Sequence, residues 1–67
     1  MEIENISDNF KDNSDWYSVY YQAELYRVEV ENYGYFVYGE DGNFVEDEEV
    51  KQALMDGVKK FRSKEQS

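Results

Sequence analysis

The sequence contains no cysteine and no histidine among its 67 residues. Without cysteine, neither a disulfide nor a thiolate metal site can form, and without histidine the usual zinc and copper sites lose their other preferred ligand. The Ser–His and Cys–His pairs of hydrolases are excluded for the same reason. The four glycines stand apart, so no glycine-rich phosphate-binding loop is present. We therefore expect a protein that is not an enzyme and that uses no metal ion or other cofactor.

Long apolar runs are also absent. Residues 1–4 are acidic and precede no apolar run, so no secretory signal is visible, and no stretch approaches the length of a membrane span. The lack of cysteine fits a reducing compartment. We expect one cytoplasmic domain over residues 1–67 that does not contact a membrane. A chain of this length buries only about 60% of its unfolded surface, so an apolar core, a partner or a second copy has to stabilise it.

Basic residues are scarce in most of the chain. Sixteen Asp and Glu face seven Lys and Arg, which gives a net charge of −9. Residues 1–50 hold fourteen acids and two bases, whereas residues 51–67 hold five bases and two acids. Phosphate contacts require Lys and Arg, so we do not expect direct nucleic-acid binding. One tryptophan, seven tyrosines and four phenylalanines argue against a disordered acidic chain.

The first half of the chain gives a mixed signal. Apolar residues spaced three and four apart in residues 3–14 predict a short helix or arm. Residues 16–31 are rich in tryptophan, tyrosine and valine, which favours strands. The alternation changes parity near Leu25, which indicates a bulge, a bend or two separate elements. We predict a strand over residues 25–31, while residues 16–23 fit either a strand or a helix.

A hairpin follows. Residues 35–38 form an apolar strand, and the Asp41-Gly42 pair after it is typical of a two-residue type I′ turn. This turn places Tyr38 opposite Val45 in a very short final strand.

The most clearly patterned element is a helix over residues 47–64. Its acidic start and basic end both suit the helix macrodipole. Gly57 lies in its interior and is expected to let the helix approach a bulky tyrosine of the sheet. The apolar stripe consists of Val50, Leu54, Val58 and Phe61.

Together these elements predict an α+β fold. A small antiparallel β-meander of three or so strands carries the C-terminal amphipathic helix on one face, with a short N-terminal helix or arm. The expected core consists of Val28, Val30, Phe36, Val45, Leu54, Val58 and Phe61.

Acidic residues form the first candidate binding surface. A helix N-terminus is satisfied by one or two acids, so a run of four at the helix start leaves a surplus, which serves either solubility or docking to a basic partner. Two glutamates on strand 25–31 lie two residues and about 6.6 Å apart, much as successive phosphates do along a nucleic-acid strand. The helix-start acids could extend that row. The acidic candidates are Glu29, Glu31, Glu40, Asp41, Glu46, Asp47, Glu48 and Glu49.

Seven tyrosines and one tryptophan form the second candidate surface, because aromatic residues outnumber what so small a core can bury with satisfied hydroxyls. They serve either cross-strand pairing on an outer sheet face or an interface, where tyrosine often anchors binding. Tyr33 and Tyr35 are the candidates for partner contact.

No residue-level motif identifies a family. In size, acidity, tyrosine content and lack of Cys and His, the chain resembles the small acidic proteins of phages and mobile elements, including anti-CRISPR proteins and other DNA mimics. This resemblance implies an inhibitor that blocks the basic nucleic-acid-binding surface of a host protein. One alternative is a protein–protein adaptor or regulatory subunit that binds through its tyrosine-rich face or through the basic C-terminal helix. Another is a homodimer that buries its spare aromatic residues.

Overall fold

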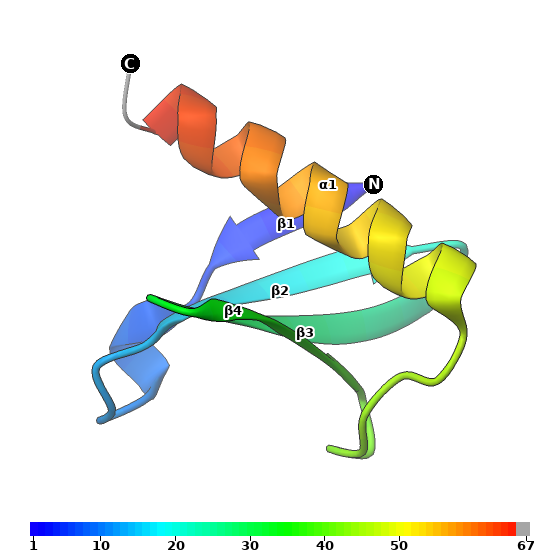
Figure 1. The fold of residues 1–67 in the computed structure, drawn as a ribbon, viewed down its shortest axis with the longest axis horizontal. Helices are drawn as coiled ribbons and strands as arrows, with labels where there is room; N and C mark the ends of the chain where they lie inside the picture. The colour runs from blue at the N-terminus through cyan, green and yellow to red at the C-terminus, as the bar shows by residue number, and fades with distance from the viewer. Residues whose placement is uncertain (66–67) are drawn as a thin grey trace.

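The structure, a computed structural model, describes residues 1–65 as a four-stranded antiparallel sheet with one helix across it. Figure 1 shows α1 (Glu48–Glu65) lying over one face of the sheet, while no α-helix among residues 1–65 covers the other face. The predicted α+β architecture is confirmed, with four strands where about three were expected. In chain order the elements are β1 (Glu2–Asn5), the 3-10 helix η1 (Ser7–Asn9), β2 (Asp15–Tyr21), β3 (Glu24–Glu31), β4 (Gly34–Gly39) and α1 (Glu48–Glu65).

The N-terminal segment is an edge strand, and only η1 is helical in the region where a short helix or arm was predicted. Ile3 pairs with Val19 of β2, and the backbone N–H of Ile6 donates to the carbonyl of Trp16 at 2.9 Å. Sheet pairing with a distant strand has overridden the local helical spacing. Gly57 of α1 makes room for this strand, because a Cβ there would meet the Met1 side chain and lie 3.5 Å from Ile3 Cδ1. The residues opposite Gly57 are thus Met1 and Ile3 rather than the expected tyrosine.

The parity change near Leu25 arises because residues 16–31 form two strands. The strand interpretation of residues 16–23 is correct up to Tyr21, after which Gln22 and Ala23 turn the chain. Both turn residues have positive φ, +51° and +64°, as a type I′ hairpin requires. Neither residue type is typical of that turn, so the hairpin had no local sequence signal.

The loop after β4 differs from the predicted hairpin by one residue. A type I′ turn needs positive φ at both central residues, but only Gly42 has it, at +86°. Gly42 N–H donates to Gly39 O at 3.0 Å, and Gly39 N–H donates to Asn43 O at 2.8 Å. This is a three-residue loop with a bulge at Gly42, and it pairs Tyr38 with Phe44 instead of Val45. The final strand is reduced to that single bridge.

The core lies between the sheet and α1. The predicted helix is confirmed and begins one residue later than expected. Of the expected core, Val45 and Phe61 are only partly buried, and Phe36 was assigned to the wrong face: its neighbour Val37 points toward the helix. Within residues 1–65, no helix combines the length and apolar character needed to cross a membrane. The buried apolar side chains are Tyr17, Val19, Val28, Val30, Val37, Leu54 and Val58.

Candidate binding face

The sheet face opposite α1, hereafter the open face, collects the alternate residues of all four strands that point away from the helix. Strand pairing places Trp16 beside Glu29 and Glu29 beside Phe36, so neighbouring strands contribute to one surface. The residues of the open face are Glu2, Glu4, Trp16, Ser18, Tyr20, Leu25, Arg27, Glu29, Glu31, Phe36 and Tyr38.

Six aromatic rings run across this surface in continuous contact. Trp16 stacks on Phe10 at 4.2 Å between ring centroids and on Tyr38 at 5.7 Å. Phe44 stacks on Tyr38 at 4.8 Å and lies 6.5 Å from Phe36. Beyond these rings, Tyr33 meets Phe36 edge to face at 6.0 Å. We call this set of residues, Phe10, Trp16, Tyr38, Phe44, Phe36 and Tyr33, the aromatic row.

Two rings of the aromatic row, Phe44 and Tyr33, are open to solvent. Phe44 is 63% exposed and Tyr33 is 78% exposed, whereas the other four rings are half-buried by their neighbours. The two exposed rings are linked through Phe36, which contacts both of them. Exposed apolar patches are a feature of interaction sites, and tyrosine is among the residue types that anchor interfaces, so this part of the face is a candidate for binding.

A buried carboxylate supports the middle of the row. Glu29 is only 9% exposed, and its Oε1 accepts a hydrogen bond from the Tyr38 hydroxyl at 3.1 Å. Its Oε2 lies 2.8 Å from the Ser14 hydroxyl, which is also 2.8 Å from Glu31 Oε1. Burial, with help from Glu29, raises the pKa of the Tyr38 phenol. Glu29 therefore orients Tyr38 and Ser14 and is not displayed to solvent.

Glu31 and Tyr33 lie together at the C-terminal end of β3. Hydrogen bonds from Tyr33 and then from Ser14 lower the pKa of the Glu31 carboxyl, which favours its charged form. The same contact with Glu31 raises the pKa of the Tyr33 phenol, which stays protonated. An exposed ring and an ionised carboxylate thus stand side by side.

The other predicted acids lie at the opposite end of the sheet. β3 pairs with β4 from Tyr26 beside Gly39 to Glu31 beside Gly34. Five residues of strand separate these ends, roughly 17 Å. Glu40 and Asp41 directly follow Gly39. The pKa of the Tyr26 phenol at the same end is raised mainly by Glu24 and also by Asp47, so the helix start lies near this end as well. The continuous acidic row expected from Glu29 to the helix start is therefore not formed.

Two of those acids have local structural tasks. Asp41 Oδ1 accepts the backbone N–H of Asn43 at 3.0 Å, which holds the loop and lowers the pKa of Asp41. Asp47 caps α1, since its Oδ1 accepts the N–H groups of Glu49 at 3.0 Å and Val50 at 3.3 Å. The remaining acids there, Glu40, Glu46, Glu48 and Glu49, are exposed.

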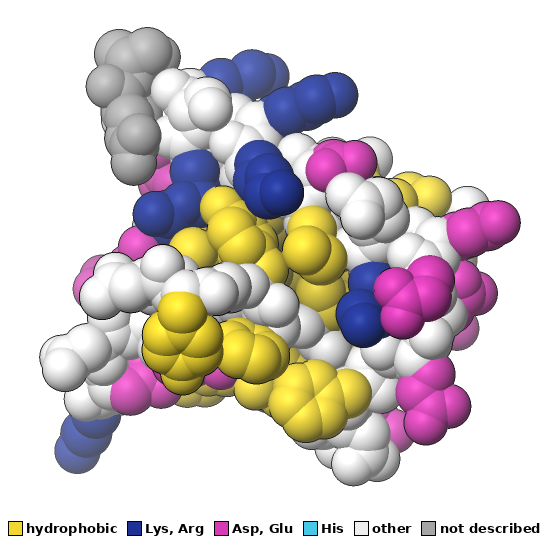
Figure 2. All heavy atoms as spheres, in the orientation of Figure 1, with side chains coloured by type: hydrophobic (Ala, Val, Ile, Leu, Met, Phe, Trp, Pro, Cys, Tyr) yellow, Lys and Arg dark blue, Asp and Glu magenta, His cyan; other side chains and the backbone are white. Residues whose placement is uncertain are grey.

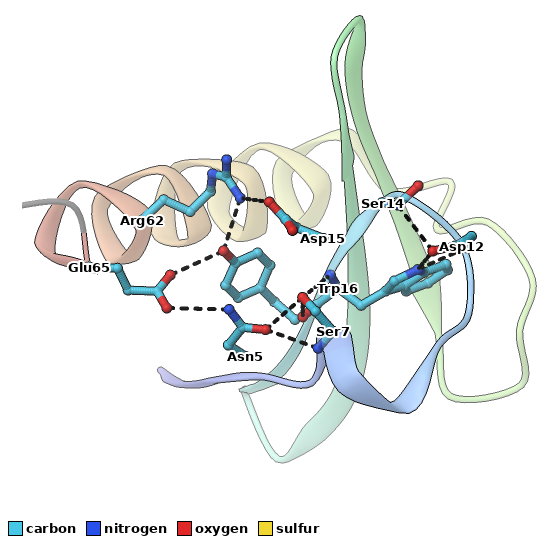
Figure 3. A network of polar contacts seen from close by, with 9 residues as sticks. Asn5, Ser7, Asp12, Ser14, Asp15, Trp16, Arg62 and Glu65 are labelled. Carbon is cyan, nitrogen blue, oxygen red and sulfur yellow. Dashed lines mark hydrogen bonds and ion pairs between the residues drawn. The ribbon is translucent and has the colours of Figure 1, made fainter.

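The helix side of the sheet is arranged differently (Figure 3). Arg62 donates to Asp15 Oδ2 at 2.8 Å and to the Tyr17 hydroxyl at 3.0 Å, and that hydroxyl donates to Glu65 at 3.1 Å. Burial is the main cause that raises the pKa of Tyr17, while Asp15 raises the pKa of Arg62. Tyr35, a predicted contact residue, is on this side, with Lys59 Nζ 5.4 Å from its ring centroid.

Charge is segregated along the helix as well. Figure 2 shows basic side chains gathered over the C-terminal half of α1 and acidic ones around its N-terminal end. Lys51 near that end lies 3.4 Å from Glu48. Among residues 1–65, no cluster of three or more acids is arranged to hold a metal ion.

Sequence reasoning identified Tyr33 and Glu31 but missed most of the aromatic row. Phe36 was placed in the core, and Phe10 and Phe44 were not proposed as contacts. Trp16 and Tyr38 were included among the spare aromatic residues but were not named as contact residues. Residues 35–38 are apolar at both parities, so alternation could not tell which pair faces the helix. The uneven mixture of valine with aromatic residues was the only available signal, since valine fits the narrow space beneath a helix.

The chain matches no protein-family model, no curated protein and no solved structure.

Proposed function

We propose that the protein is a non-catalytic binding protein that inhibits a basic partner by occupying its nucleic-acid-binding surface. The observation that carries the proposal is the aromatic row on a face whose strands contribute four acids and one base. Charge complementarity then selects a positively charged partner, and rings anchor it. The resemblance to acidic proteins of phages and mobile elements, anti-CRISPR proteins among them, supports the same function.

The acids flank the row instead of forming a phosphate-like line. Glu31 stands at one end of the sheet and Glu40 at the other, while Glu46 and Glu49 are exposed beside the Asp47 cap at the start of α1. A net charge of −9 on so small a body also draws a basic partner from a distance, which speeds association and makes it sensitive to salt.

The test begins with a pull-down from the native host cell, eluted with a salt gradient. We expect a nucleic-acid-binding protein that elutes as salt rises and that DNA or RNA displaces. The variant E46K/E49K should weaken binding strongly, because it reverses two exposed charges that neither cap the helix nor hold the loop. The matched comparison uses single charge reversals: D56K, in the middle of α1, changes the net charge as much as E46K does and should bind more tightly than E46K. Equal affinity of the two variants, or no competition with nucleic acid, would contradict the proposal.

A second candidate is an adaptor that binds through the aromatic row while the acids serve solubility. The exposure of Phe44 and Tyr33 favours it. It predicts weak salt dependence and a large loss of affinity for F44A. A homodimer through the same face would juxtapose like charges, and sedimentation at micromolar concentration would reveal it.

A further inference from the structure

We infer that the open face docks an arginine-bearing segment of the basic partner, with guanidinium groups stacked on the exposed rings of the aromatic row and paired with its neighbouring carboxylates. The inference rests on the proposed function for the existence of a basic partner. It adds the face that is used and the side chain that is recognised.

On the helix side of the sheet, the chain's own arginine already occupies a site made of a tyrosine ring and a carboxylate. The Arg62 guanidinium lies over the Tyr17 ring, 5.8 Å from its centroid, and pairs with Asp15. Helix α1 thus delivers a cation to a tyrosine ring and a nearby carboxylate. Guanidinium suits such a place because it is planar, stacks on rings and forms directed hydrogen bonds to carboxylates.

The open face has rings and carboxylates but little positive charge of its own. The Trp16 indole N–H donates to the Asp12 carboxylate at 3.1 Å, and Tyr33 stands beside Glu31. Across β1 to β4, the strands contain a single basic residue, Arg27. Arg27 lies opposite Tyr38, in the interior of the row. Each end of the aromatic row combines ring surface with a carboxylate, and the strands bring no cation to either end, where an arginine of a partner can supply one.

A cleft adjoins the Tyr33 end of the row. It has a volume of about 390 Å³, and its lining includes Asp12, Asp15, Glu31 and Tyr33. Its one basic lining residue, Arg62, is already paired with Asp15. An incoming guanidinium next to Tyr33 thus meets net negative charge.

The other occupants of an aromatic face fit less well. A second copy would bring the same excess of carboxylates against this surface, and nucleic acid would be repelled by it. A lysine-rich partner satisfies the charge, but its compact, strongly hydrated ammonium gains less from stacking on rings than a guanidinium does. An arginine side chain can stack on the aromatic rings and pair with the carboxylates at the same time.

Two peptide probes separate charge from stacking: nona-arginine and nona-lysine, titrated into the full chain at low salt. Trp16 is the sole tryptophan and lies within the row, so its fluorescence reports occupation directly. We expect nona-arginine to bind about fivefold or more tightly than nona-lysine. It should perturb Trp16 emission and the backbone amide signals of Tyr33, Tyr38 and Phe44.

The variants F44A and Y33A should reduce the arginine preference to near unity while the circular dichroism spectrum stays unchanged. The matched control is Y20A, which removes a ring that is 49% exposed on the open face but outside the row. It should leave the preference intact.

The outcomes distinguish this inference from the proposed function. Equal binding of the two peptides, or amide shifts confined to residues 40–49, would overturn the arginine-docking face and leave a charge-only inhibitor standing. Arginine preference without competition between the captured partner and nucleic acid would keep the docking face and remove the proposed function. If neither peptide binds, both are wrong.

Discussion

Both faces of the sheet carry aromatic and acidic residues, but the two faces differ in what surrounds these side chains. On the helix side, Tyr17 is 2% exposed and its hydroxyl contacts Arg62 and Glu65. On the open face, Tyr38 and Trp16 find neighbours mainly among other rings and carboxylates. The difference is made by α1, which supplies both apolar cover and cations to one side only. The valine-bearing face is covered by α1, and the face with Trp16, Phe36 and Tyr38 is left without that cover. We propose this uncovered face as the place where a partner binds.

The largest expected change in folding stability comes from a substitution in the core beneath α1. L54A should destabilise the fold by about 2–5 kcal/mol, because Leu54 is 0% exposed and its loss leaves a cavity against the sheet. The open-face control is L25A, at a half-buried position, which should cost clearly less. Urea denaturation followed by circular dichroism measures both. Similar losses would mean that the two faces are not energetically distinct.

The next largest change in stability comes from removing the N-terminal cap of α1. D47A should cost about 1 kcal/mol, since it removes the cap that accepts the N–H groups of Glu49 and Val50. E46A removes an exposed acid that caps nothing and should change stability by a few tenths of a kcal/mol at most. Thermal melts of the two variants give the comparison. A cost for E46A as large as that for D47A would indicate a general charge effect rather than capping.

A smaller effect, of opposite sign, tests how α1 meets β1. G57A should stabilise by about 0.5–1 kcal/mol through helix propensity, because the atom in its way is the far end of the flexible Met1 side chain. G57L should destabilise instead, since a larger side chain also has to displace Ile3. Both are read from urea midpoints. Destabilisation by alanine itself would show that Met1 cannot move aside.

The smallest effect is a pH dependence. Because burial raises the pKa of Tyr17 in the folded chain, its contribution to stability is complete below the unfolded pKa of about 10 and is lost as pH rises through the folded value. Stability should therefore fall above about pH 10, and Y17F should flatten that fall. Y33F, which changes a tyrosine that is 78% exposed, should flatten it less. The measurement is the urea midpoint of each variant between pH 9 and pH 11. If the midpoints of Y17F and Y33F fall equally steeply with pH, burial of Tyr17 is not the cause of the pH dependence.

Much of the fold could be predicted because its signals are local. The 3.6-residue spacing of Val50, Leu54 and Val58 and the charged ends of the segment identified α1. Strand propensity identified β3, and Gly42 marked a turn. The N-terminal strand could not be predicted in this way, since its pairing with β2 depends on residues far along the chain.

The candidate site was less predictable. The acids were correctly seen as abundant, but the roles of Glu29, Asp41 and Asp47 depend on which groups they meet. Their carboxylates support Tyr38, the loop and the helix start, respectively. The aromatic row also depends on a shift of one residue in the pairing after β4. The bulge at Gly42 brings Phe44 beside Tyr38, where the predicted two-residue turn would have placed Val45.

The sequence by itself determined the acidity of the chain, the lack of Cys and His, the helix and the strand-forming segments, since these follow from composition and from contacts between near neighbours. Only the tertiary structure decided which aromatic residues are covered. A strand with apolar residues at both parities has no preferred face until a helix lies on one of them. The choice of face buried Val37 and left Phe36, Tyr38 and Phe44 for the open face.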